Sequence, residues 1–193
     1  AYGRLTPQKA QYLYQQLKAI PTYIETMLHC KTIHRQIHAM AQACKPVPWF
    51  ILLSSGLLQL TLPEAALKLT ETSTNMVICH TTEAFKHGHK VLLDGWPINN
   101  IHTTPQCIYV IPPAELYTGL VYADLLQHWQ HIPPSQPQRL FLISFDNSPE
   151  RPPHFIQHGS GLTLQLPKAS GLCSLFATLL VFQWLSQQLA FVR

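Results

Sequence analysis

The stretch WFILLSSG, residues 49–56, decides the fold of this 193-residue chain. Its first five residues are apolar without interruption, which is typical of a strand buried on both faces of a parallel sheet. Two serines and a glycine end the run, and residues 57–70 after them are predicted to be helical. A buried strand, a short polar turn and a helix make up the first part of a βαβ unit.

Strands and helices alternate in the same way along the rest of the chain. Short apolar runs predict four more strands, and longer segments with apolar residues at helical spacing predict the helices. The predicted strands are residues 75–79, 106–112, 139–145 and 161–167, and the further helices are residues 81–88 (a short helix or turn), 114–132 and 171–191. This order predicts an α/β fold, a three-layer doubly wound sandwich with a mostly parallel five-stranded sheet.

Two helices are predicted to precede the sheet. Residues 7–20 form the first, with Thr6 as its N-cap and Pro7 in its first turn. Pro21 is expected to end this helix, because proline disrupts a helix interior, and a second helix follows over residues 22–44. The predicted organisation is a helical lead-in, residues 1–45, and a single α/β domain, residues 46–193.

The composition excludes several functional classes. Apolar residues make up 47% of the chain and charged residues 11%, which does not fit a disordered protein. The net charge of +4 is spread out without a run of basic residues, so we expect no nucleic-acid binding. The most apolar segment, residues 175–192, contains three glutamines and a serine, and we expect a core helix there and no membrane partner.

The cysteines indicate the compartment. There are five of them, an odd number, and no C-x-x-C motif occurs, which is typical of reduced thiols in a cytosolic protein. No secretory signal is visible in the opening residues AYGRLTPQ. The expected localisation is therefore cytoplasmic.

The turn Ser54-Ser55-Gly56 is the first candidate binding site. In doubly wound sheets, ligands bind at the carboxyl ends of the strands. Small hydroxyl residues and a glycine at that place can present backbone N–H groups to a phosphate. An ordinary turn has the same composition, so both interpretations stay open, and no glycine-rich nucleotide motif is present in the sequence.

Lys68, Glu71 and His87 form the second candidate site. Glu64 and Lys68 are four residues apart on a predicted helix, which by itself indicates a surface ion pair. Glu71 lies on the same face near the helix end, where a carboxylate beside a lysine would suit a general base. His87 precedes Gly88, and a histidine there is either a titratable site residue or a solvent-facing loop residue.

The eleven histidines raise the question of a metal site. His34 and His38 are four residues apart on a predicted helix, and His87 and His89 flank a glycine. The sequence contains no H-E-x-x-H motif and no cysteine-rich zinc motif. We therefore expect neither a metal nor a cofactor.

Three segments together resemble one known family. Residues 17–28, LKAIPTYIETML, resemble the helical segment that precedes the second sugar-isomerase domain of glucosamine-6-phosphate synthase. Residues 64–73, EAALKLTETS, and residues 83–88, EAFKHG, resemble two motifs of that domain at the same interval. The resemblance covers residues 15–190 and implies the doubly wound sandwich of sugar-isomerase domains.

The resemblance also implies a ligand, a reaction and a partner. The ligand would be a phosphorylated sugar, fructose 6-phosphate or glucosamine 6-phosphate, and the reaction a ketose–aldose isomerisation. Glu71 falls on the base that moves a proton between C1 and C2, His87 on a ring-opening histidine that reaches a neighbouring subunit's site, and Lys68 on a lysine of the same site. The implied partner is a second copy, as a homodimer, or another sugar-isomerase domain.

The sequence departs from the family in several places. It has no counterpart of the first isomerase domain with the main phosphate loop, of the glutaminase domain, or of the tail lysine, and Ser54-Ser55-Gly56 replaces a Gly-Arg-Gly. Activity is therefore expected to need a second chain or domain, and the chain is compatible with being a piece of a longer enzyme. The alternative is a non-catalytic module that senses sugar phosphate or acts as a dimerisation scaffold.

Overall fold

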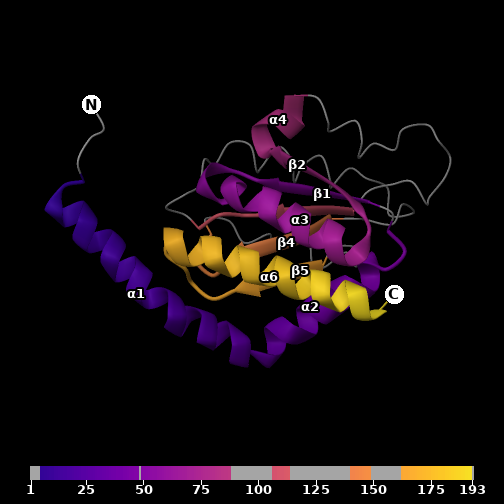
Figure 1. Ribbon diagram of the computed structural model, residues 1–193, viewed down its shortest axis with the longest axis horizontal. Helices are drawn as coiled ribbons and strands as arrows, with labels where there is room; N and C mark the ends of the chain where they lie inside the picture. The colour runs from indigo at the N-terminus through magenta and orange to yellow at the C-terminus, as the bar shows by residue number, and fades with distance from the viewer. Residues whose placement is uncertain (1–4, 48, 88–105, 114–139, 149–161, 193) are drawn as a thin grey trace.

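The computed structural model describes residues 5–47, 49–87, 106–113, 140–148 and 162–192. Helices and strands alternate along this part of the chain, as the sequence predicts (Figure 1). The elements are α1 Pro7–His29, α2 Lys31–Cys44, β1 Trp49–Ser54, the 3-10 helix η1 Gly56–Thr61, α3 Leu62–Ser73, β2 Met76–Thr81, α4 Thr82–His87, β3 Gln106–Val110, β4 Leu140–Phe145, β5 Leu162–Leu166 and α6 Gly171–Val192. The helix predicted over residues 114–132 lies outside the described residues.

The five strands form one parallel sheet in the order β2-β1-β3-β4-β5. The predicted α/β fold with a five-stranded sheet is thus confirmed. The chain order reverses between β1 and β3, and in such sheets the crevice beside the carboxyl ends of the two strands receives ligands. Ser54 at the end of β1 is in register with Thr81 of β2 on one side and with Val110 of β3 on the other.

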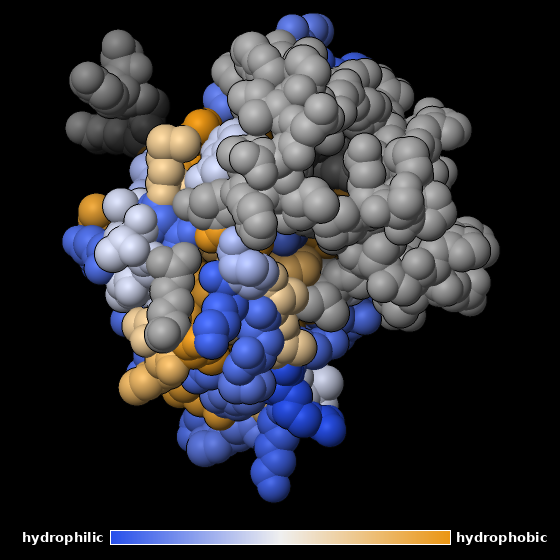
Figure 2. All heavy atoms as spheres, turned by 90° about the vertical axis from the view of Figure 1, so that its right-hand side faces the viewer, coloured by the Kyte–Doolittle hydropathy of each residue, from blue (hydrophilic) through white to orange (hydrophobic). Residues whose placement is uncertain are grey.

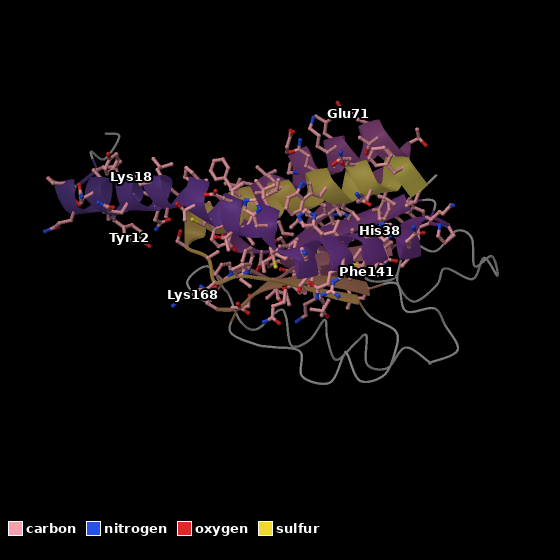
Figure 3. The ribbon with its side chains drawn as sticks, turned by 90° about the horizontal axis from the view of Figure 1, so that it is seen from below. Tyr12, Lys18, His38, Glu71, Phe141 and Lys168 are labelled. Atoms are coloured by element: carbon pink, nitrogen blue, oxygen red, sulfur yellow. The ribbon has the colours of Figure 1, made fainter. Side chains whose placement is uncertain are left out.

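Strand β1, which lies between β2 and β3, is buried on both faces, as its uninterrupted apolar run predicts. Phe50 and Leu52 belong to the main core cluster, which continues through the strands into α2, α3 and α6. The alternate residues Ile51 and Leu53 are equally buried. Helices α2, α3 and α6 form a layer over one face of the sheet (Figures 1 and 3).

The C-terminal helix α6 completes this helical layer. Within the described residues it is the one helix long and apolar enough to cross a membrane, by length and composition alone. In the fold it packs against α1, α2, α3 and η1, and its inner residues, among them Phe182 and Leu185, belong to the main core cluster. Figure 2 faces the end of the molecule where α6 ends and shows hydrophobic atoms exposed among hydrophilic ones.

Helix α1 contradicts the prediction that Pro21 ends the first helix. Thr6 is the N-cap, as predicted, but the helix continues through Pro21 and the break falls at Cys30. An interior proline costs a helix about 3 kcal/mol. Tertiary contacts oppose this cost, because Met27 is buried in the core and the Tyr23 hydroxyl donates to the Pro167 carbonyl at 2.7 Å.

Candidate functional site

Ser54, the last residue of β1, has a structural role. Its side chain is buried, and its hydroxyl donates a hydrogen bond to the Val110 carbonyl at 2.9 Å. This bond joins the ends of β1 and β3 at the point where the strand order reverses. The Ser54 hydroxyl proton is therefore already engaged.

Ser55 differs from Ser54 because its buried hydroxyl has no hydrogen-bond partner within the described residues. Ser55 is the N-cap residue of η1, yet its side chain makes no capping hydrogen bond. Gly56 follows with φ of 57°, a left-handed conformation that glycine adopts without a Cβ clash. The turn thus combines a buried hydroxyl that lacks a described partner with a backbone position free of side-chain atoms.

Thr82 supplies a second hydroxyl of the same kind at the neighbouring strand end. It is the first residue of α4, it is buried, and no described residue pairs with its hydroxyl. Thr81 caps α4 instead, accepting from the Ala84 N–H at 3.1 Å. Because Ser54 and Thr81 are register partners, Ser55 and Thr82 follow adjacent strands at the same edge of the sheet. We call Ser55 and Thr82 the hydroxyl pair.

Among the described residues, the hydroxyl pair lacks the hydrogen bonds that buried polar groups usually make. A buried polar group without a hydrogen bond costs about 1 to 3 kcal/mol. Two such groups at adjacent strand ends, beside the crevice of a doubly wound sheet, are typical of a site that awaits a polar ligand. Ser55 was a predicted site residue and Thr82 was not, although a hydroxyl residue directly after the second strand was a signal that could have indicated it.

Lys68 and Glu71 form an exposed ion pair on α3. The Lys68 ammonium lies 3.2 Å from a Glu71 carboxylate oxygen and 3.6 Å from one of Glu64. The hydrogen bond with Glu71, together with the negative charges of Glu71 and Glu64, raises the pKa of Lys68. Glu71 lies on the outer surface of the helical layer, away from the sheet (Figure 3).

His87 is the exposed last residue of α4, which is anchored by the buried side chain of Phe85. Gly88 and His89 lie outside the described residues. Helix α3 ends just before the amino end of β2, whereas α4 follows its carboxyl end. A six-residue strand spans roughly 17 to 20 Å. Glu71 and His87 of one chain therefore lie far apart, at opposite ends of β2. His87 is at the carboxyl end of the strands, where the hydroxyl pair also lies.

The other candidate chemistries find little support in the described part of the chain. His34 Nε2 contacts the Leu28 carbonyl at 2.8 Å and His38 Nδ1 contacts Gln188 Oε1 at 3.0 Å, while no three potential ligands gather around one point there. All five cysteines are described, and none of them is paired with another. Burial raises the pKa of Cys79 to about 11, which disfavours the reactive thiolate.

Comparison with known proteins yields relatives by structure alone. No family model and no curated protein matches the sequence. The fold matches the C-terminal domain of glucosamine-fructose-6-phosphate aminotransferase from Francisella tularensis with a TM-score of 0.73 and 20% identity, over 97% of this chain and 47% of that one. A putative tagatose-6-phosphate ketose/aldose isomerase from Clostridium novyi matches with a TM-score of 0.67 and 15% identity, over 96% of this chain and 44% of that one.

A further match covers almost all of both chains. An Escherichia coli protein whose structure contains a bound phosphosugar has a TM-score of 0.61 and 11% identity, over 97% of this chain and 93% of that one. The chain thus spans about half the length of the first two structures and nearly the whole of the third. The resemblance to the second isomerase domain of glucosamine-6-phosphate synthase is therefore confirmed in three dimensions, and the described chain has the sugar-isomerase fold.

Proposed function

We propose that the chain is a phosphosugar-binding domain whose ligand belongs to the fructose 6-phosphate and glucosamine 6-phosphate class. The observation that carries the proposal is the hydroxyl pair, two buried donors without partners in the described structure at adjacent strand ends. The phosphate group offers several strong acceptor oxygens, which would satisfy these donors and the backbone N–H groups after Ser55. The shared fold of the E. coli protein with its bound phosphosugar supports this ligand class.

Isothermal titration calorimetry with both hexose phosphates and with inorganic phosphate tests the proposal. We expect the wild type to bind a hexose phosphate at millimolar concentration or below, and Ser55→Ala to bind it at least tenfold more weakly, the effect of losing about 1.4 kcal/mol. No heat from the wild type at millimolar ligand would overturn the proposal.

Ser54→Ala is the matched control for Ser55→Ala. It removes a hydroxyl that bonds to Val110, so we expect a loss of about 1 kcal/mol in the free energy of unfolding and little change in ligand binding. Ser55→Ala has no described hydrogen bond to lose and is expected to be at least as stable as the wild type. Equal effects of the two substitutions on binding would contradict the assignment of Ser55 to the ligand.

We further propose that the domain contributes to catalysis, in an active site that a second copy of the chain or another sugar-isomerase domain completes. In that site Glu71 moves the proton between C1 and C2, Lys68 stabilises the developing negative charge and His87 assists ring opening. The separation of Glu71 and His87 along β2 supports a shared site. The test is Glu71→Gln in an isomerase assay with the candidate partner chains present, and unchanged turnover would rule out the role of Glu71.

A non-catalytic sensor or scaffold is the second candidate. The observation in its favour is that Glu71 pairs with Lys68 in solvent, at the opposite end of β2 from Thr82. A module of this kind would bind the hexose phosphate in the calorimeter. It would show no isomerase activity with any of the candidate partner chains. The free thiols suit the cytoplasmic location that we propose for either function.

A further inference from the structure

Helix α1 has one stripe of residues, apolar except for Gln16, that faces the body of the protein. Its residues recur at steps of three and four, and they are Leu13, Gln16, Ile20, Tyr23 and Met27. Met27 is buried in the core, and Ile20 and Tyr23 pack against it. Gln16 Oε1 accepts a hydrogen bond from the Leu172 N–H at 3.1 Å. This stripe accounts for the attachment of α1 to α6.

A second apolar stripe runs along α1, and all its members except the half-buried Ile24 are exposed in the described structure. We call it the outer seam, and it consists of Ala10, Tyr14, Leu17, Pro21, Ile24 and Leu28, at alternating steps of four and three residues. Tyr14 is 54% exposed, Leu17 52% and Leu28 45%. The helix projects from the helical layer, with Tyr12 and Lys18 on the projecting part (Figures 1 and 3). Alternating steps of four and three are the pattern of a helix that pairs with another helix.

The residues that flank the outer seam restrict how a partner helix can lie. The residues on one flank of the outer seam are Leu13, Ile20 and Met27, which already belong to the stripe that faces the body. On the other flank Lys18 and Glu25 are exposed, one heptad apart. In a parallel pair of identical helices the two flanks face each other, so neither charge would meet an opposite charge. In an antiparallel pair each flank meets its own copy, and Lys18 can face Glu25.

We propose that the outer seam binds the outer seam of a second copy of this chain, antiparallel and related by a two-fold axis. In this register Leu17 packs against the partner's Leu28 and Pro21 against the partner's Ile24. Lys18 then lies beside the partner's Glu25, and the symmetry repeats each contact, as a two-fold interface requires. The Lys18 ammonium already lies 5.5 Å from the centre of the Tyr14 ring, which holds it along the seam. The inference says which surface pairs two copies of the chain. It does not depend on whether the chain binds a sugar phosphate.

Sedimentation equilibrium of the full chain with two matched variants tests the surface. Leu17 and Tyr12 are on the same helix and are 52% and 57% exposed, but Tyr12 lies on the side opposite the outer seam. We expect the wild type and Tyr12→Asp to be dimers and Leu17→Asp to be a monomer, with unchanged circular dichroism in all three. A monomeric wild type at 100 µM, or a dimeric Leu17→Asp, would overturn the proposal.

Charge reversal tests the antiparallel register. Lys18→Glu and Glu25→Lys each place like charges together twice in the dimer, so each is expected to weaken dimerisation about tenfold or more. The double variant restores opposite charges and is expected to dimerise within about threefold of the wild type. Both side chains are exposed, so the variants should fold. Failure of the double variant to recover, after both single variants weaken the dimer, would overturn the two-fold arrangement.

Glucosamine 6-phosphate titrated into the same proteins separates this inference from the proposed function. A dimer that responds to Leu17→Asp and yet gives no heat with the sugar supports the outer seam and contradicts the sugar site. Sugar binding by a wild type that stays monomeric supports the sugar site and contradicts the outer seam.

Discussion

The two ends of the parallel sheet treat their polar side chains in opposite ways. At the carboxyl end, the hydroxyl pair is buried and lacks partners in the described structure, whereas near the amino end of β2, Lys68 and Glu71 satisfy each other in solvent. The first arrangement costs about 1 to 3 kcal/mol per group, whereas an ion pair in solvent contributes little to stability. Unsatisfied burial, and not the presence of charged residues, is therefore the feature on which the proposed ligand site at the carboxyl end rests.

The largest effect is expected from removing the anchor of the carboxyl end. Phe85→Ala deletes a fully buried ring from α4, and such deletions lower the free energy of unfolding by about 3 to 5 kcal/mol. Because α4 carries Thr82, ligand binding should fall as well. Urea denaturation measures the stability, with Phe191→Ala, a 76% exposed phenylalanine, as a control that should change it by less than about 0.5 kcal/mol. A loss below about 1 kcal/mol for Phe85→Ala would mean that α4 is not held by this ring.

A pair of isosteric substitutions tests the unsatisfied hydroxyl directly. Thr82→Val removes a buried hydroxyl that no described residue pairs with, so we expect the protein without ligand to gain roughly 1 kcal/mol of stability and to bind hexose phosphate more weakly. Thr61→Val removes a hydroxyl that donates to the Leu58 carbonyl at 2.7 Å, and should lose about 1 kcal/mol. If both variants lose stability equally, Thr82 has a hydrogen bond in solution and the contrast between the two ends of the sheet disappears.

The smallest effect is expected at the amino end. Lys68→Met breaks exposed ion pairs and should lower the free energy of unfolding only slightly in low salt, and by less in concentrated NaCl. The pKa of Lys68 is raised in the folded protein, so the stabilisation is present below the unfolded pKa near 10.5 and is lost as the pH rises above it. Thermal unfolding of both proteins at neutral pH and above the pKa of lysine measures this. A larger loss at the alkaline pH than at neutral pH would have the wrong sign for the assigned ion pair.

The sequence predicted the strands most directly where they are buried on both faces, as β1, β3 and β4 are. Uninterrupted apolar runs locate such strands without any knowledge of their neighbours, and the predicted ends of all five differ from the observed ones by at most two residues. The course of α1 through Pro21 was not predictable in the same way. Its cause is tertiary, since Tyr23 and Met27 contact segments far along the chain.

The candidate site was predictable in part. The position of Ser55 after a buried strand was enough to select it, but its contrast with Ser54 depends on which hydroxyl reaches the Val110 carbonyl. Lys68 and Glu71 were correctly recognised as sharing a helix face, since that follows from their spacing. Their distance from His87 along β2 depends on the direction of α3 relative to the strands, and the motif spacing carries no information about that direction.

The bond between Leu172 and Gln16 has a consequence for folding during synthesis. It joins residues 156 positions apart, so the helical layer closes only when α6 has left the ribosome. Until then the surfaces of α2 and α3 that α6 covers stay exposed, which is the condition in which nascent chains aggregate or bind chaperones. Folding of this domain is therefore expected to wait for the synthesis of the 22-residue helix α6, which is the step that commits the chain.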